Sequence, residues 1–440
     1  MRHNLIYLLR KSLLSLFLLL LANVVSAQFL MDMVDTTTET GKGMLSIYKK
    51  FDHLRFSGYI QPQFQLAASK GVKSFEGGDF GPRVSNRFML RRSRVRIDYV
   101  HFEEGRKPGV QFVFQFDANE RGFTVRDVWG RIFENRYKLF SLTAGMFARP
   151  FGFETNLSSS DRESPERGRM NQLLMRSERD LGAMVSFDVR KDEHKLKRLK
   201  IDLGVFNGQG ITANGDFDNN KDIIGRISLK PLPLTKKVSI AAGASVLWGG
   251  LENNTRYHYT TVTDNGISKM QVDSSIGNIG KLSQRRYFGA DLQLKIKNRK
   301  GYTQLRAEVI AGKQSSTAAN PETPTALLTG NDGFYTRKFS GAYFYLLQNI
   351  FSEKHQLIIK YDWYDGNSDV KKTEIGVPGA GFTPADIRYN TLGMGYLSYL
   401  TDNIKLVLYY ARVTNEKTLL TGYTGDLKDD VFTCRLQFRF

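Results

Sequence analysis

The sequence predicts an all-β protein, a closed antiparallel barrel of about sixteen strands that crosses a membrane. Three observations lead to this prediction. Short segments along most of the chain alternate apolar and polar residues with a period of two. The chain opens with a pattern for export, and its 30 Phe and 20 Tyr lie largely on the apolar parity or at segment ends. A barrel wall has lipid on one side and water on the other, and this environment explains such alternation.

The first 27 residues have the pattern of a secretory signal peptide. Basic residues precede an apolar run (13–21) and the small-residue cleavage pattern Val25-Ser26-Ala27. The rest of the chain contains no uninterrupted apolar stretch of about 18 residues, so no helical membrane span is expected. Residues 28–53 alternate weakly and are expected to be periplasmic, with a short helix over 44–51.

Residues 54–440 are predicted to form the barrel. In the last segment, 432–440, the apolar residues share one face, while Thr433, Arg435 and their polar neighbours share the other. A soluble β-sandwich would also alternate, but its core would have to bury these arginines, whereas a water-filled lumen keeps them hydrated. Further alternating runs occupy 57–66, 92–100, 110–117, 199–206, 223–230, 290–296, 305–310, 357–363 and 404–410.

The polar connections between the runs are of two lengths. The long connections are expected outside the cell and the short connections, such as 297–300, in the periplasm. Pro62 lies inside the run 57–66 and cannot donate a ladder hydrogen bond, so a bulge or an early strand end is expected there. The long connections cover 68–84, 155–180, 207–222, 251–284, 313–338, 366–387 and 414–428.

Composition limits the function. The formal net charge is +19, and loss of the signal peptide, which carries three basic residues and no acid, leaves about +16. Such a charge suits small anions or the anionic headgroups of outer-membrane lipid, and an exported protein meets little nucleic acid. The single cysteine, Cys434, excludes an intramolecular disulfide. Metal-ligand spacing and a G-x-S-x-G turn are absent from the sequence, so no catalytic residue, metal or cofactor is expected, and the protein is not predicted to be an enzyme.

Several stretches, in order along the chain, resemble one known family. They are Gly58-Tyr59-Ile60-Gln61, Leu90-Arg91-Arg92-Ser93-Arg94, Val125-Arg126-Asp127-Val128-Trp129, Ala148-Arg149-Pro150-Phe151-Gly152-Phe153-Glu154, Phe206-Asn207-Gly208-Gln209-Gly210 with Asp218-Asn219-Asn220-Lys221-Asp222, and Tyr361-Asp362-Trp363-Tyr364-Asp365. The chain resembles the phosphate-selective porins of the O and P type, in the divergent form of Bacteroidetes-type bacteria. The resemblance implies a sixteen-stranded homotrimeric porin of a Gram-negative outer membrane, narrowed by an inward-folded loop and lined by arginines. Residues 155–180 are the corresponding loop here.

An anion pathway needs cations that replace part of the hydration of the ion, and arginine does this with paired hydrogen bonds. Arg92, Arg94 and Arg96 share the polar parity of one strand at steps of about 6.6 Å, which predicts a ladder facing the lumen. Arg91 has the opposite parity, so it lies at the membrane interface, at a subunit contact or on a bulge. The other expected pathway residues are Arg126, Arg131, Arg162, Arg167, Arg169, Arg306 and Lys360.

Alternatives remain open at this point. The loop 155–180 carries basic and acidic residues in nearly equal numbers, so it is either an arginine-lined throat or a solvated loop with mixed ion pairs. The pore is expected to pass small anions passively. The alternatives are a weakly selective general porin and a barrel that serves as an adhesin or anchor through loops such as 251–284. A lysine cluster at the pore mouth is not matched residue by residue, so anion preference is better supported than phosphate preference.

Overall fold

The computed structural model describes residues 53–103 and 107–440, so the predicted signal peptide and residues 28–52 lie outside the described part. Within it, no helix combines the length and apolar character needed to cross a bilayer. The helical turns are α4 (Arg169–Leu174), η1 (Ile276–Asn278) and η2 (Pro384–Asp386). The strands are β1 (Leu54–Ala67), β2 (Asn86–Glu103), β3 (Lys107–Asn119), β4 (Gly122–Phe133), β5 (Phe140–Ala148), β6 (Arg179–Asp188), β7 (Leu199–Phe206), β8 (Asp222–Pro233), β9 (Val238–Glu252), β10 (His258–Asp264), β11 (Ile267–Asp273), β12 (Leu282–Asn298), β13 (Gly301–Ser316), β14 (Phe334–Asn349), β15 (His355–Asp365), β16 (Tyr389–Tyr399), β17 (Ile404–Asn415) and β18 (Val431–Arg439).

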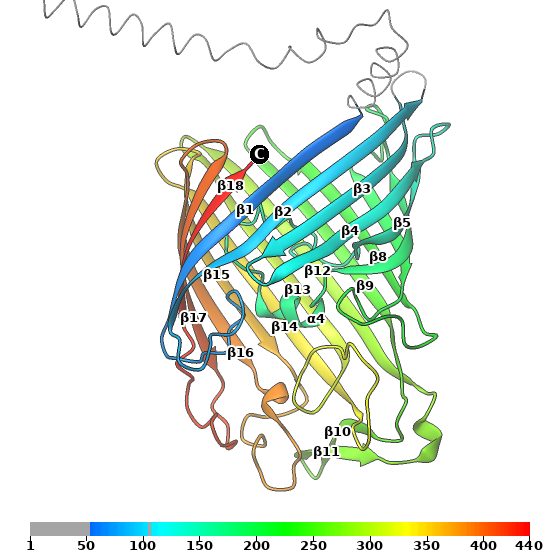
Figure 1. The fold of residues 1–440 in the computed structure, drawn as a ribbon, viewed down its shortest axis with the longest axis vertical. Helices are drawn as coiled ribbons and strands as arrows, with labels where there is room; N and C mark the ends of the chain where they lie inside the picture. The colour runs from blue at the N-terminus through cyan, green and yellow to red at the C-terminus, as the bar shows by residue number, and fades with distance from the viewer. Residues whose placement is uncertain (1–52, 104–106) are drawn as a thin grey trace, which may run out of the picture. The chain divides into compact units, whose positions relative to one another are not determined.

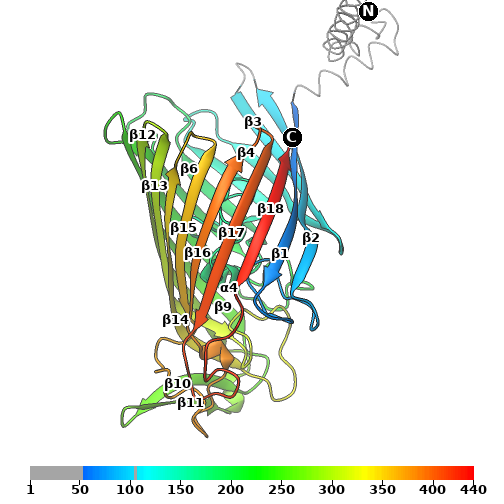
Figure 2. The same cartoon turned by 90° about the vertical axis from the view of Figure 1, so that its left-hand side faces the viewer.

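The strands close into a ring (Figures 1 and 2). Each barrel strand pairs with the next, β9 pairs with β12, and β1 pairs antiparallel with β18. The sheet has eighteen strands, of which the hairpin β10–β11 lies outside the ring, so sixteen form the wall. The predicted fold class is therefore confirmed, and a closed ring leaves no unpaired backbone facing lipid.

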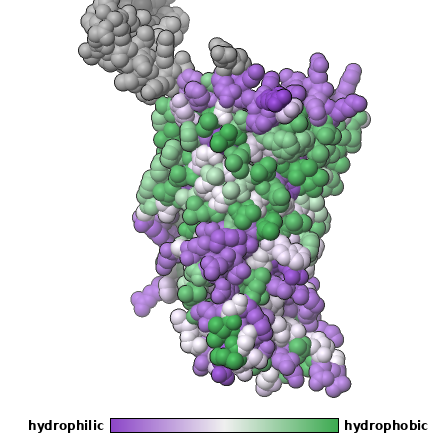
Figure 3. Space-filling view, turned by 90° about the vertical axis from the view of Figure 1, so that its right-hand side faces the viewer, coloured by the Kyte–Doolittle hydropathy of each residue, from purple (hydrophilic) through white to green (hydrophobic). Residues whose placement is uncertain are grey.

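The predicted alternation of faces is also confirmed. On β3 the side chains of Phe112 and Phe114 are 44% and 42% exposed, whereas Val113 between them is fully buried. The outward apolar side chains form a band between a polar rim and a wide polar surface on the side of the long loops (Figure 3). A band of this kind is what lipid requires. The chain is thus a multi-pass barrel of the outer-membrane type.

Two local expectations are wrong. β1 continues through Pro62 without a change of register, since both Ile60↔Phe438 and Gln63↔Arg435 keep the same pairing with β18. The strand is held on both sides, by β2 and by β18, so the loss of one N–H donor does not end it. The connection 251–284 is not simply a loop, because it contains β10, β11 and η1.

Candidate functional site

One long connection folds into the barrel. β5 ends at Ala148 and β6 begins at Arg179, so the connection comprises residues 149–178, and the last two residues of the segment predicted as 155–180 belong to a strand. We call residues 149–178 the inner loop. It carries buried carboxylates, Glu154, Glu163 and Glu166 among them, and its helix α4 lies within the outline of the barrel in Figure 1.

Ion pairs tie the inner loop to β13 and β15, and a hydrogen bond to a backbone carbonyl ties it to β17. The Glu154 carboxylate accepts a hydrogen bond from Lys360 Nζ at 2.8 Å, and Glu163 accepts from Arg306 Nη1 at 2.7 Å. Lys405 Nζ donates to the carbonyl oxygen of Ser160 at 2.5 Å. Two of the predicted pathway residues, Arg306 and Lys360, are therefore paired with loop carboxylates.

A second group of contacts lies at the seam where the barrel closes. Glu166 accepts hydrogen bonds from Arg91 Nε at 2.9 Å, Arg92 Nη2 at 2.7 Å and Arg435 Nη2 at 2.7 Å. Burial alone would raise the pKa of Glu166, but the charges of these three guanidinium groups hold it well below its usual range. Because adjacent Arg91 and Arg92 reach the same carboxylate, the alternation of faces breaks between them, as in a bulge.

The remaining ladder residues also face inward and also have acidic partners. Arg94 Nε donates to Asp117 at 2.9 Å, and Arg94 Nη1 donates to Ser159 Oγ of the inner loop at 2.9 Å. Arg96 forms a paired contact with Asp98 at 2.7 and 2.8 Å. The ladder is therefore a row of ion pairs in which Arg96 keeps the most exposed side chain, at 35%.

The other predicted residues occupy different environments. Arg126 and Arg167 share the carboxylate of Glu178. Arg162 is 2% exposed, and its Nε and Nη1 have no hydrogen-bond partner. The Arg169 guanidinium lies 4.5 Å from the ring centre of Phe75 and 3.7 Å from that of Tyr389. The structure therefore does not gather the ten residues into one site.

Three adjacent cavities lie along the inner loop on the side of β2. The outer cavity, of about 1180 Å³, is lined by long loops, and the middle cavity, of about 260 Å³, shares Arg91 and Arg176 with it. The third, which we call the throat cavity, has a volume of about 370 Å³ and shares Arg94 and Arg167 with the middle one. The three cavities thus follow the arginines of β2 in order. The throat cavity is lined by Arg94, Arg96, Gln115, Asp127, Trp129, Arg131, Phe147, Ala148, Pro150, Thr155, Asn156, Leu157, Ser158, Ser159, Arg167, Arg179, Met184, Lys200, Asp202, Arg226 and Ser228.

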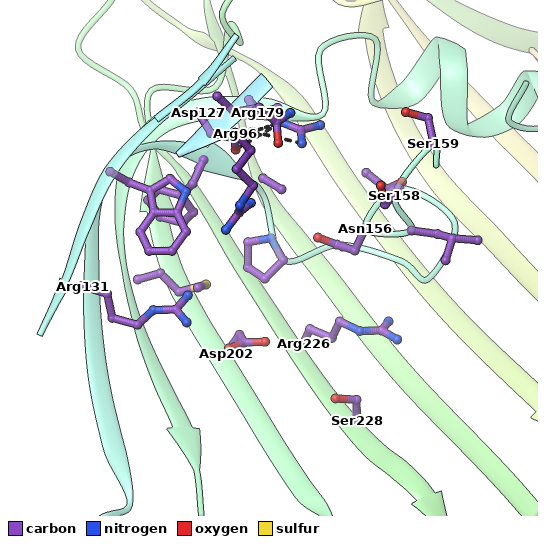
Figure 4. Close-up of a pocket in the computed structure, with 18 of the residues that line it drawn as sticks. Arg96, Asp127, Arg131, Asn156, Ser158, Ser159, Arg179, Asp202, Arg226 and Ser228 are labelled. Atoms are coloured by element: carbon purple, nitrogen blue, oxygen red, sulfur yellow. Dashed lines mark hydrogen bonds and ion pairs between the residues drawn. The ribbon is translucent and has the colours of Figure 1, made fainter. Parts of the chain in front are cut away.

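Positive charge dominates this lining, with seven basic and two acidic side chains. Six of the seven basic groups are paired with a carboxylate. The seventh, Arg131, donates from Nε to Thr143 Oγ1 at 2.8 Å and has no ion pair with a carboxylate among residues 53–103 and 107–440. Figure 4 shows Arg96 and Arg131 extending from the wall into the cavity, with Asn156 and Ser158 on the loop beside it.

Sequence reasoning missed two of these cations, Lys200 and Arg226, whereas Arg179 lies within the segment 155–180 that was expected as a possible throat. Lys200 and Arg226 lie at polar positions of runs that were predicted as strands, so the alternation of faces could have predicted that both side chains face the lumen. Parity could not place them at the throat, because height along the barrel depends on how the strands are staggered. Within the described residues, no three His, Cys, Asp or Glu side chains are grouped as a metal site would require.

Comparison with known proteins gives the fold. Neither the models of protein families nor the curated protein sequences give a match to this chain. Among solved structures, OprB of Pseudomonas putida superposes with a TM-score of 0.59 at 9% identity, over 92% of this chain and 98% of its own. The outer membrane channel DcaP of Acinetobacter baumannii superposes with a TM-score of 0.53 at 10% identity, over 88% of this chain and 97% of its own. This chain therefore has the fold of outer-membrane porins and channels.

Proposed function

We propose that this protein is an outer-membrane porin through which small anions diffuse passively. The observation that carries the proposal is the lining of the throat cavity, where seven basic side chains outnumber two acidic ones. A narrow passage with low-dielectric walls focuses the field of such groups and raises the local concentration of anions.

The proposal gives different tasks to the predicted pathway residues. Arg94, Arg96, Arg131 and Arg167 line the throat cavity, where passing ions meet them. Arg92 and Arg126 line the middle cavity, and Arg169 lines the outer one. The other three, Arg162, Arg306 and Lys360, line none of these cavities. Arg306 and Lys360 hold the inner loop to the wall, and Arg162 is buried within the loop.

The sequence resemblance suggests phosphate, and we include phosphate among the small anions that the porin passes. Guanidinium forks match phosphate oxygens, and Arg131 offers one without a competing carboxylate. A weakly selective general porin is the second candidate. It is favoured by the pairing of six throat cations with carboxylates, which reduces their net field.

The reversal potential in a potassium chloride gradient across a planar bilayer separates the candidates. We expect wild-type channels to prefer chloride, and the triple variant Arg96→Gln/Arg131→Gln/Arg226→Gln to lose most of that preference. The matched control is Lys269→Gln/Lys371→Gln/Lys372→Gln, which removes three exposed charges from outer loops and lines none of the three cavities.

A wild-type channel without anion preference would contradict the proposal, as would a control variant that shifts the reversal potential as much as the throat variant. A barrel that serves only as an adhesin or anchor would carry no current in the same apparatus.

A further inference from the structure

The throat cavity has apolar walls as well as charged ones. Asp127, Trp129 and Arg131 follow one another on the inner face of β4, so an indole occupies a position where the lumen of a porin is ordinarily polar. Leu157 of the inner loop lines the same cavity, and both side chains are partly exposed. Pro150 adds apolar surface where the loop begins.

Two cations lie against this indole. The Arg131 guanidinium carbon is 4.9 Å from the ring centre of Trp129, and that of Arg96 is 6.0 Å away. These contacts hold the two groups in place by cation–π attraction. The charge of Arg96 is also paired with Asp98, whereas Arg131 has no ion pair within the described residues. Arg131, whose remaining polar contact is the Thr143 hydroxyl, therefore presents a positive charge directly beside an apolar surface.

This combination suits one class of anion better than another. Inorganic phosphate is polar on every side, so the indole and the leucine give it no favourable contact in return for the water that it loses against them. A carboxylate on an apolar ring can place its charge at Arg131 and its body against Trp129 and Leu157. The cavity volume of about 370 Å³ lies within the range of small-molecule sites, about 300–1,000 Å³.

We propose that the throat cavity is a binding site for organic anions with a flat apolar body, of which benzoate is the simplest probe, in preference to inorganic phosphate. This rests on the proposed function, since a channel that excludes anions would not admit the ligand. Figure 4 shows Arg131, Arg226 and Asn156 around the cavity, with Asp202, whose carboxylate is paired with Lys200, between the two arginines.

Block of the chloride current in planar bilayers tests the site. Added to the bath in increasing amounts, benzoate should reduce the current at a lower concentration than acetate or inorganic phosphate. Benzyl alcohol, which has the ring without the charge, should not block. Trp129→Gln removes the aromatic face and no charge, so it should weaken block by benzoate several-fold while block by acetate changes little.

Two further variants keep the test decisive if the Trp129→Gln barrel does not fold. Leu157→Asn changes the loop side of the cavity and should also weaken benzoate block selectively, whereas Arg131→Gln should weaken block by benzoate and by phosphate alike. Leu327→Gln, an exposed apolar residue of an outer loop, is the control and should change nothing.

The outcomes separate the two proposals. Equal block by benzoate and acetate, or benzoate block that survives both Trp129→Gln and Leu157→Asn, would overturn the organic-anion site while chloride preference stands. Absence of chloride preference in the wild-type channel would overturn the anion porin itself.

Discussion

At the residue scale, Glu166 joins two parts of the barrel that meet at its seam. Its carboxylate contacts Arg91 and Arg92 on β2 and Arg435 on β18, and it is 3% exposed. Removing the negative charge would leave three guanidinium groups without their shared anion, and two of them, Arg92 and Arg435, are almost fully buried. Breaking a buried ion pair in this way is far more costly than losing an exposed one.

We therefore expect Glu166→Gln to destabilise the barrel by about 3–5 kcal/mol. The measurement is the temperature at which the folded band disappears on a heat-modifiability gel. Asp161→Asn is the matched control, because its pair with Arg439 is about half exposed on both sides and should contribute about 0–1 kcal/mol. Equal shifts for the two variants would show that Glu166 is not a structural anchor.

At the element scale, the first outer loop, residues 68–85, packs on the inner loop. The Phe75 ring covers the Arg169 guanidinium, and the Phe75 carbonyl accepts a hydrogen bond from Gln172 Nε2 at 2.9 Å. Beside it, burial and then the charge of Glu166 raise the pKa of Glu76 to about 7, against the opposing effect of Lys360. One carboxylate oxygen of Glu76 is buried without a hydrogen-bond partner.

This arrangement predicts a pH dependence for the docked loop. In the docked loop Glu76 stays protonated up to about pH 7, whereas in the free loop it loses its proton near its usual pKa of 4.5. Docking is therefore strongest below about pH 4.5, weakens as the pH rises to about 7, and changes little at higher pH. The facing groups are Glu166, Asp362, Lys360 and Arg435.

Hydrogen exchange, corrected for the intrinsic effect of pH, measures the protection of residues 68–85. We expect less protection at about pH 7.5 than at about pH 5, and no such loss in Glu76→Gln, whose side chain does not titrate. Residues 366–387 serve as an internal reference. A loss of the same size in Glu76→Gln would assign the effect to another group.

At the scale of the whole molecule, Phe440 extends the pairing of β18 with β1 that closes the ring. Phe440 N–H donates to the Gly58 carbonyl at 3.0 Å, and Gly58 N–H donates to the Phe440 carbonyl at 3.1 Å. A Cβ at Gly58 would lie 2.4 Å from the Phe440 ring and 2.5 Å from the Arg94 carbonyl oxygen, so only glycine fits there.

Deleting Phe440 should lower the amount of heat-modifiable barrel in the outer membrane, because two hydrogen bonds at the end of the β1–β18 ladder are lost. Phe440→Leu keeps the backbone and removes only the aromatic ring, so it separates the role of the two hydrogen bonds from that of the ring. A normal yield of folded barrel after the deletion would show that neither role matters.

Assembly is the second prediction at this scale. We propose a homotrimer, which the sequence resemblance implies and which small outward positions such as Ser93 and Gly225 would accommodate. Native mass measurement in mild detergent should give three chains. A monomer at every protein concentration tested would contradict it.

The sequence by itself determined the barrel fold and which face most wall residues occupy. Alternation is local, because the side of the sheet on which Arg94 or Phe112 lies depends only on its neighbours along the strand. Predictions from local patterns are wrong where a contact with a residue distant in the sequence changes the local structure. The pairing of β1 with β18 and β2 carries the strand past Pro62, and the carboxylate of Glu166 draws in both Arg91 and Arg92.

Only the tertiary structure decided which cations line the passage. Arg131 and Arg306 have the same inward parity, yet Arg131 lies at the throat cavity and Arg306 is bound to Glu163. Ring closure and entry of the inner loop bring together residues such as Glu166 and Arg435, which are 269 positions apart. Pairing between charges so far apart in the sequence depends on the stagger of the strands and on the path of the loop. The period-two pattern of a single strand determines neither.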